Sequence, residues 1–250
     1  MDIKGKVALV TGGGSGIGAA IAKALAAEGA RVMIAGRRPE QLRQTVQAIG
    51  ELGGDAAIHV GDVARAQDCE ALVAATEAQF GPVDVLVNNA GILPKGKPLT
   101  DYSVEEWDAV MSVNVRAAFL LAKRVLPRMV ERGSGHIVNI SSVSGIRFFV
   151  GESIYGLSKH ALNALTNFIS EEYGARGIHC LSICPGLVHT DMGLTLEPTH
   201  RDRLLTPEDI AGSVIWALRQ RHGVRVPFPI VLEPQDNPWE GGYPMLNQKF

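Results

Sequence analysis

The sequence of 250 residues predicts an α/β fold, a doubly wound parallel sheet of seven strands with helices on both faces. Short apolar runs rich in β-branched residues alternate with longer segments whose apolar residues recur at helical spacing. The short runs are apolar throughout, which is typical of strands buried on both faces. The segments between them are long enough to be crossover helices. Because no linker, repeat or low-complexity stretch interrupts this alternation, we expect one domain over residues 1–250.

The seven apolar runs are spread over almost the whole chain. The predicted strands are KVALV (6–10), ARVMIA (30–35), AAIHV (56–60), VDVLVN (83–88), HIVNIS (136–141), IHCLSI (178–183) and PIVLE (229–233). Each is separated from the next by at least one segment that can form a crossover, so neighbouring strands in the sheet are expected to run parallel.

The predicted helices occupy the segments between the strands. They cover residues 16–29, 39–52, 64–80, 103–131, 154–173 and 207–220. Gly29 and Gly174 stand where helices are expected to end. Thr206 supplies a capping side chain and Pro207 the first helical position, with two acids in the first turn, so the last helix is expected to begin here.

The composition argues against several classes of function. Apolar residues make up 46% of the chain, the formal net charge is −2, and no basic block is present, so no nucleic-acid partner is expected. No apolar run approaches the roughly 18 residues of a membrane span. The apolar N-terminal run passes directly into glycines, as a strand does rather than a signal peptide. Three cysteines without a Cys-x-x-Cys pair indicate neither disulfides nor a metal site, and we expect a cytoplasmic protein.

A glycine-rich loop over residues 11–18 joins the first predicted strand to the first predicted helix. Glycines permit a tight turn and let backbone amides approach a pyrophosphate, while the following helix presents its positive end. This arrangement predicts a Rossmann-like dinucleotide site, although a flexible turn without a ligand is the alternative. The candidate cofactor residues of the loop are Gly12, Gly14, Ser15, Gly16, Ile17 and Gly18.

The end of the second predicted strand bears on the choice of cofactor. An acidic side chain at this place would accept hydrogen bonds from the adenosine ribose of NAD. The chain has Gly36 here, followed by Arg37 and Arg38, and arginine suits a ribose 2′-phosphate. We therefore expect NADP(H) to be preferred over NAD(H). The alternative is a solvated turn whose arginines bind nothing.

Tyr155 and Lys159 are four residues apart in a predicted helix, so their side chains share one helix face. A free tyrosine has a pKa of about 10, and a nearby ammonium favours its phenolate. Tyr155 can then exchange a proton with a carbonyl or alcohol oxygen. Ser142, at the end of the fifth strand, can hydrogen-bond the same oxygen. Taken singly, each residue could instead be a packing, solvated or capping side chain.

These features together resemble the short-chain dehydrogenase/reductase family, in its single-domain branch, over roughly residues 4–216. The matching motifs are Thr11-Gly12-x-x-x-Gly16-x-Gly18, Asp62-Val63, Asn88-Asn89-Ala90-Gly91, the set of Asn114, Ser142, Tyr155 and Lys159, and Pro185-Gly186 with Val188 and Thr190. The resemblance implies that the cofactor site extends to Asp62, Val63, Asn89, Ala90, Gly91, Tyr155, Lys159, Pro185, Gly186, Val188 and Thr190.

The resemblance also implies an activity. Asn114, Ser142, Tyr155 and Lys159 would form the catalytic set, in which Lys159 holds the nicotinamide ribose and Asn114 anchors a water that connects Lys159 with solvent. The expected function is an NADP(H)-dependent oxidoreductase that interconverts a ketone or aldehyde and its alcohol, with Tyr155 as general acid/base. One alternative is an inactive cofactor-binding sensor or scaffold on the same fold. An isomerase or dehydratase of the longer branch is disfavoured because a second domain is missing.

The substrate is expected to be a small molecule held in an apolar pocket. By position relative to the motifs, the candidate pocket residues are Leu93, Pro94, Ser142, Ile146, Phe148, Phe149, Met192 and Leu194. Arg147 could meet an anionic group or form an outward salt bridge.

The chain departs from the family pattern in two places. Many NADP-using relatives carry a basic residue where this chain has Ser15. Residues 234–250 form an atypical tail that we expect to fold over the substrate cleft or a partner subunit's site, the alternative being a tail that only packs between subunits or stays disordered. The family also implies a homotetramer, with the helices after Asn114 and through Tyr155 at a two-fold interface.

Overall fold

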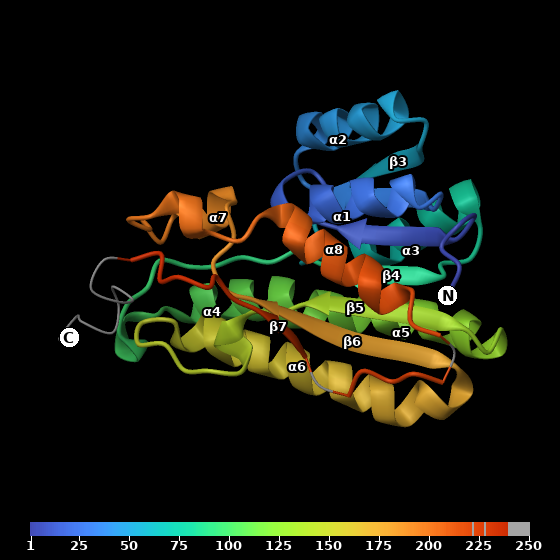
Figure 1. Ribbon diagram of the computed structural model, residues 1–250. Helices are drawn as coiled ribbons and strands as arrows, with labels where there is room; N and C mark the ends of the chain where they lie inside the picture. Colours follow the sequence, from blue (N-terminus) through green and yellow to red (C-terminus); the bar gives the residue numbers. More distant parts are fainter. Residues whose placement is uncertain (222, 228, 240–250) are drawn as a thin grey trace.

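The computed structural model describes residues 1–221, 223–227 and 229–239. Seven strands form one sheet in the order β3-β2-β1-β4-β5-β6-β7, with every neighbouring pair parallel (Figure 1). They are β1 (Val7–Thr11), β2 (Arg31–Gly36), β3 (Asp55–Val60), β4 (Val85–Asn88), β5 (Gly135–Ile140), β6 (Ile178–Pro185) and β7 (Ile230–Leu232). The predicted seven-stranded parallel sheet is confirmed.

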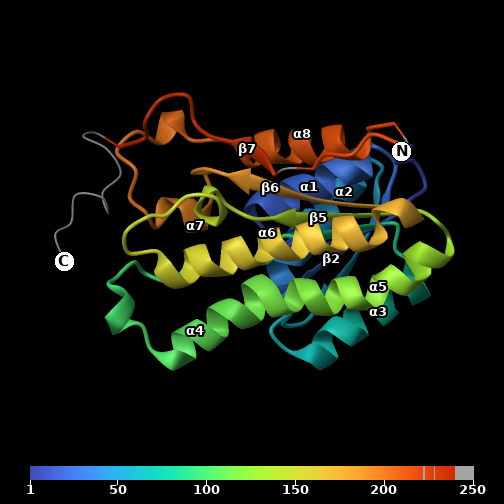
Figure 2. The same ribbon diagram turned by 90° about the horizontal axis from the view of Figure 1, so that it is seen from below.

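Helices cover both faces of the sheet, as predicted (Figure 2). On one face lie α1 (Gly16–Ala27), α2 (Pro39–Glu51) and α8 (Pro207–Leu218), and on the other lie α3 (Ala66–Phe80), α5 (Ala117–Glu131) and α6 (Ser153–Tyr173). Two further helices, α4 (Val104–Met111) and the short α7 (Asp191–Leu194), precede α5 and follow β6. Within the described residues, no helix combines the length and apolar character that a membrane crossing requires.

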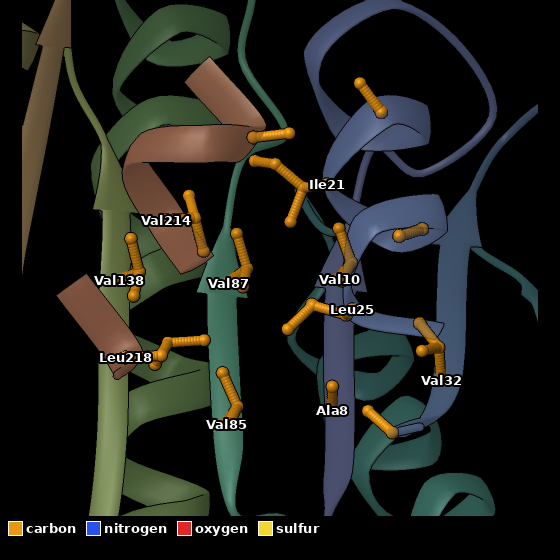
Figure 3. Close-up of a cluster of buried hydrophobic side chains, with 14 of the residues drawn as sticks. Ala8, Val10, Ile21, Leu25, Val32, Val85, Val87, Val138, Val214 and Leu218 are labelled. Carbon is orange, nitrogen blue, oxygen red and sulfur yellow. The ribbon is translucent and has the colours of Figure 1, made fainter. Parts of the chain in front are cut away.

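The strands bury alternate side chains against the two helix layers. In β1, Ala8 and Val10 face α1 and α8, whereas Val7 and Leu9 face α3 and α5. Figure 3 shows side chains of α1, among them Leu25, packed over Ala8 and Val10. Leu25 is fully buried, and such burial contributes about 1.5–3 kcal/mol for an aliphatic side chain. The apolar runs of the sequence therefore form a core on each face of the sheet.

The order of the strands fixes where a ligand can bind. From β1 the chain builds outward through β2 and β3, then returns to β4 on the opposite side of β1. The loops after β1 and β4 therefore leave the sheet toward different sides, and a crevice opens at the carboxyl ends of these strands. This edge of the sheet carries the candidate site.

Candidate active site

A cavity of about 1150 Å³ lies at the carboxyl ends of the strands. Its walls come from the loops after β1 to β6, the first turns of α6 and the segment after β7. Pockets for one drug-sized ligand usually span about 300–1,000 Å³, so this cavity is large enough for a dinucleotide and a small substrate together.

The glycine-rich loop after β1 forms one end of this cavity. Gly12 and Gly16 have φ angles of 66° and 50°, in the left-handed region that favours glycine. α1 begins at Gly16, and Ser15 makes no side-chain capping bond to it. The backbone N–H groups at the positive end of α1 are therefore not capped by Ser15 and suit an anion. The loop fits a pyrophosphate.

The loop after β1 is tied to the loop after β4. Thr11 Oγ1 accepts hydrogen bonds from the backbone N–H groups of Asn89 and Ala90, both at 3.0 Å. Asn89 Nδ2 donates to the Thr11 carbonyl at 2.9 Å. A Cβ on Gly18 would lie 2.3 Å from the Gly12 carbonyl oxygen, so Gly18 allows α1 to pack against the loop and does not itself line the cavity.

The adenosine end of the expected cofactor site lies after β2 and β3. Arg37 and Arg38 are exposed and line the cavity beside Gly36. Arg38 Nη2 donates to Ser15 Oγ at 3.1 Å, which joins this turn to the glycine-rich loop. Asp62 and Val63 also line the cavity.

Tyr155 and Lys159 lie one turn apart on α6 and both are buried at the cavity wall. Lys159 Nζ donates to the Ile140 carbonyl at 3.0 Å and lies 5.6 Å from the centre of the Tyr155 ring. Burial lowers the pKa of Lys159 to about 8. Burial also raises the pKa of Tyr155, while a hydrogen bond with Ser142 opposes that rise. Among the protein's own groups, burial therefore outweighs the effect expected from the lysine.

Ser142 follows β5 and begins the 3-10 turn Val143–Gly145. Its Oγ accepts a hydrogen bond from the Ser144 N–H at 3.1 Å and donates one to Ser144 Oγ at 3.3 Å. These contacts hold the hydroxyl at the cavity wall close to Tyr155.

Asn114 lies in a π-helical turn, Ser112–Arg116, between α4 and α5. Its Oδ1 accepts from the Ile92 N–H at 2.9 Å, and its Nδ2 donates at 3.0 Å to the Ile92 carbonyl and to Ser158 Oγ. A single helix over residues 103–131 was expected, and the π turn is the difference. Asn114 is buried behind Gly91 and is not part of the main cavity lining. It connects the loop after β4 to α6.

The segment after β6 closes the other side of the cavity. The Gly186 N–H donates to the Leu232 carbonyl at 2.7 Å, and Thr190 Oγ1 caps α7 by accepting from the Gly193 N–H at 3.0 Å. The expected cofactor residues here, Pro185, Gly186, Val188 and Thr190, all line the cavity.

The structure divides the expected substrate residues into two groups. Leu93, Ser142, Phe149 and Met192 line the cavity, whereas Pro94, Ile146, Phe148 and Leu194 do not. Phe148 is 89% exposed and stacks on His160, with ring centroids 5.0 Å apart, so it faces away from the cavity. Arg147 lines the cavity and forms a bidentate salt bridge with Glu233, at 2.5 and 2.7 Å.

The described part of the tail lies against the cavity. Trp239 Nε1 donates to the Leu196 carbonyl at 3.2 Å, and the His200 N–H donates to the Pro238 carbonyl at 2.9 Å. Pro234 and residues 236–239 line the cavity. Residues 240–250, on which the rest of the tail prediction falls, lie outside the described part of the chain.

Two side chains of this site were missed in the sequence. Glu152 is only 5% exposed and lines the cavity one helical turn before Tyr155. Ser144 Oγ donates to Glu152 Oε2 at 2.7 Å. The only signal was spacing, because Glu152 precedes Tyr155 by three positions and Ser144 follows Ser142 by two.

Residues 6–201 match the model of the short chain dehydrogenase family. This chain is a short-chain dehydrogenase. It is 38% identical over 221 residues to an uncharacterized oxidoreductase of Staphylococcus aureus strain MRSA252, which covers 88% of this chain and 94% of that protein. It is 36% identical over 224 residues to an uncharacterized oxidoreductase of Staphylococcus epidermidis, covering 90% of this chain and 95% of that protein. The resemblance inferred from the motifs is confirmed, and the chain is an oxidoreductase of this family.

Solved structures of other short-chain dehydrogenases share the fold. Levodione reductase superposes with a TM-score of 0.86 at 33% identity, over 92% of this chain and 96% of that one. A single-residue variant of actinorhodin polyketide ketoreductase, solved with NADPH, gives 0.87 at 34% identity, with the same shares covered. The 3-ketoacyl-(acyl-carrier-protein) reductase of Brucella melitensis, solved with NADH, gives 0.86 at 28% identity, over 93% and 98%.

Proposed function

We propose that this short-chain dehydrogenase is an NADP(H)-dependent oxidoreductase that interconverts a ketone or aldehyde and its alcohol. The observation that carries the proposal is the convergence of distant residues on one cavity. Ser142 after β5, and Tyr155 and Lys159 on α6, line the same cavity as the glycine-rich loop after β1. A Rossmann-like fold that only binds a dinucleotide needs the glycine-rich loop, but it does not need Ser142, Tyr155 and Lys159 beside it.

The residues present fit a dinucleotide. The loop after β1 and the start of α1 would hold the pyrophosphate, because Ser15 leaves the helix N-terminus without a side-chain cap. Asp62 and Val63 would border the adenine, and Lys159 would reach the nicotinamide ribose. When bound, the nicotinamide supplies or accepts the hydride.

The preference for NADP(H) rests on the end of β2. No carboxylate stands at Gly36 to accept bonds from a ribose, and the guanidinium groups of Arg37 and Arg38 line the cavity there. The ketoreductase variant solved with NADPH supports this preference, whereas the reductase solved with NADH shows that the fold also serves NAD(H).

The protein supplies a proton and holds the reacting oxygen. In the direction of reduction, Tyr155 donates its proton to the carbonyl oxygen as negative charge develops there. Ser142 donates a hydrogen bond to the same oxygen. The charge of Lys159 beside the phenolate that remains on Tyr155 stabilises it. In the direction of oxidation, Tyr155 accepts the alcohol proton.

The lining favours an apolar or aromatic substrate. Leu93, Phe149 and Met192 contribute apolar surface to the same cavity as Ser142. Arg147 is paired with Glu233, so an anionic group would have to compete with this carboxylate for it.

The test is an assay of the purified chain with NADPH and a panel of aliphatic, aromatic and thioester carbonyl compounds. Cofactor oxidation should accompany formation of the matching alcohol, identified by mass spectrometry. NADPH binding without turnover of any compound, in either direction, would instead support the inactive sensor.

A further inference from the structure

The side of α6 that carries Tyr155 and Lys159 has a third polar side chain. Asn163 follows Lys159 by four positions, as Lys159 follows Tyr155, so the three residues share one face of the helix. Asn163 is partly buried and takes no part in the proposed proton transfer. A partly buried amide on this face is expected to have hydrogen-bond partners of its own.

The Asn163 amide holds the turn that follows β5. Asn163 Nδ2 donates to the Gly145 carbonyl at 2.9 Å, and Gly145 is the last residue of the 3-10 turn Val143–Gly145. The last carbonyls of a helical turn have no partner within that turn, so they need one from elsewhere. Because Gly145 is buried, its carbonyl would be costly to leave without the bond from Asn163.

The turn packs closely against α6 at this point. A Cβ added to Gly145 would lie 2.8 Å from Asn163 Nδ2 and 2.9 Å from the carbonyl carbon of Lys159. Just before the turn, Ser141 Oγ donates to the Lys159 carbonyl at 3.2 Å. Ser142 therefore stands between two hydrogen bonds, at Ser141 and at Gly145, that both end on α6.

A third element contacts the Asn163 amide. Its Nδ2 and Oδ1 lie 3.6 and 3.7 Å from Cys184 Sγ, within reach of a weak sulfur hydrogen bond. Cys184 is fully buried near the end of β6. Asn163 thus joins α6 to the turn after β5 and to the end of β6.

Ser142 and Tyr155 must meet at one substrate oxygen, although they come from different elements. Ser142 Oγ accepts from the Ser144 N–H at 3.1 Å, a bond that fixes this oxygen within the turn and uses none of its protons. That bond cannot place the turn as a whole relative to α6, whereas the bonds of Ser141 and Asn163 can. Placement matters, because a displacement of about 1 Å at a reaction site can lower the rate about a hundredfold.

We propose that Asn163 is a positioning residue for carbonyl reduction, which holds the Gly145 end of the turn on α6 so that the Ser142 hydroxyl donates to the same oxygen as Tyr155. This inference rests on the proposed function. The Ser142 bond is strongest in the transition state, when negative charge develops on the oxygen. Loss of Asn163 should therefore lower kcat and leave KM and the Kd for NADPH nearly unchanged.

The test compares Asn163→Leu with Asn167→Leu. Leucine keeps the branched shape of asparagine without its polar groups, and Asn167 is exposed one turn later on the same helix. For NADPH-dependent reduction of a good substrate, Asn163→Leu should lose about tenfold in kcat, with KM within about twofold of the wild type. Asn167→Leu should match the wild type. A wild-type kcat in Asn163→Leu would overturn the inference.

A double-variant cycle separates positioning from a merely structural role. In the Ser142→Ala background, Asn163→Leu should cause no further loss of rate, because the hydroxyl that Asn163 positions is absent. Single-turnover rates with the enzyme in excess measure this slow background. The same tenfold loss, roughly, in both backgrounds would show that Asn163 acts on another group and would overturn the inference.

Hydrogen exchange tests the hold on the turn without activity. The N–H groups of Gly145, Ile146 and Arg147 are hydrogen-bonded within the turn, so they should exchange faster in Asn163→Leu than in the wild type or Asn167→Leu. Unchanged protection in Asn163→Leu would overturn the inference. A wild type that turns over no carbonyl compound overturns the proposed function instead, and the exchange rates then still test the bond to Gly145. If Asn163→Leu does not fold, Asn163→Ala replaces it, with Asn167→Ala as the control.

Discussion

At the scale of single residues, Arg37 and Arg38 stand where the cofactors NADP and NAD would differ in the proposed site. Both guanidinium groups are exposed on the cavity wall, and Arg38 is held by Ser15. A charge-assisted hydrogen bond contributes about 1.5–3 kcal/mol, which is roughly tenfold to a hundredfold in affinity. In the proposed site, these side chains would therefore determine which cofactor is preferred.

We expect kcat/KM to be higher with NADPH than with NADH, and the ratio to fall about tenfold or more in Arg37→Ala because a 2′-phosphate loses a charged partner. Arg43→Ala is the matched control, since Arg43 pairs with Glu40 on the outer side of α2. Steady-state kinetics with both cofactors measure the ratios. Equal efficiency of the wild type with NADPH and NADH would contradict the assignment.

His136 gives a prediction about stability rather than activity. It lies in β5, is 7% exposed, and stacks on His179 with ring centroids 4.8 Å apart. Burial lowers its pKa from 6.5 to about 3. Below pH 6.5, His136 binds a proton in the unfolded chain but stays neutral in the folded protein. The free energy of unfolding therefore falls as the pH drops toward 3.

Between pH 7.5 and 5, this residue should reduce the free energy of unfolding by about 2 kcal/mol, a loss that His136→Leu should abolish. His189→Gln is the control, because His189 is exposed. Urea unfolding at the two pH values measures the difference. The same pH dependence in His136→Leu and the wild type would show that another group is responsible.

At the scale of elements, the strands and crossover helices follow from local patterns, which is why the sequence predicts them. The π turn around Asn114 does not follow from a local pattern, because it depends on hydrogen bonds to Ile92 after β4 and to Ser158 on α6. The outward direction of Phe148 depends on its stacking with His160. Contacts between segments far apart in the sequence leave no local pattern, and the burial of Glu152 was missed for the same reason.

The segment after β7 leads into the tail whose sequence departs from the family pattern. Hydrogen bonds join Trp239 to Leu196, Pro238 to His200, and the Asn237 carbonyl to Arg203. They connect residues 237–239 to the segment after α7, whose Leu196 also lines the cavity. We therefore expect this part of the tail to border the substrate.

Truncation before Asn237 should raise KM for a good substrate several-fold, while NADPH affinity and subunit assembly survive. Trp239→Ala is the milder companion, since it removes one of the three contacts and keeps the backbone. Substrate kinetics and NADPH fluorescence titration give the two readouts. An unchanged KM in a well-folded truncated protein would show that the tail does not contribute to substrate binding.

At the scale of the whole molecule, α5 and α6 lie side by side on one outer face (Figure 2). Large apolar side chains on this face are exposed, among them Phe119, Leu157 and Phe168. Exposed apolar side chains on one helix layer are typical of an interface between copies of a chain, and closed two-fold symmetry is the usual outcome. Family resemblance points in the same direction.

We expect a homotetramer, with a light-scattering mass four times the 26.7 kDa of one chain. Phe168→Glu places a charge on the expected interface and should reduce the mass to that of a smaller species. Glu51→Lys, on the opposite helix layer at the end of α2, should leave the mass unchanged. A wild-type monomer at micromolar concentration would contradict the prediction.

We propose that Tyr155 exchanges the proton at a site completed by Ser142 and Lys159, and Tyr155→Phe tests this role most directly because it removes only the hydroxyl and keeps the ring. We expect kcat for carbonyl reduction to fall by about 10²–10⁴, while the Kd for NADPH changes little. If Tyr155→Phe keeps most of the wild-type rate, Tyr155 is not the acid.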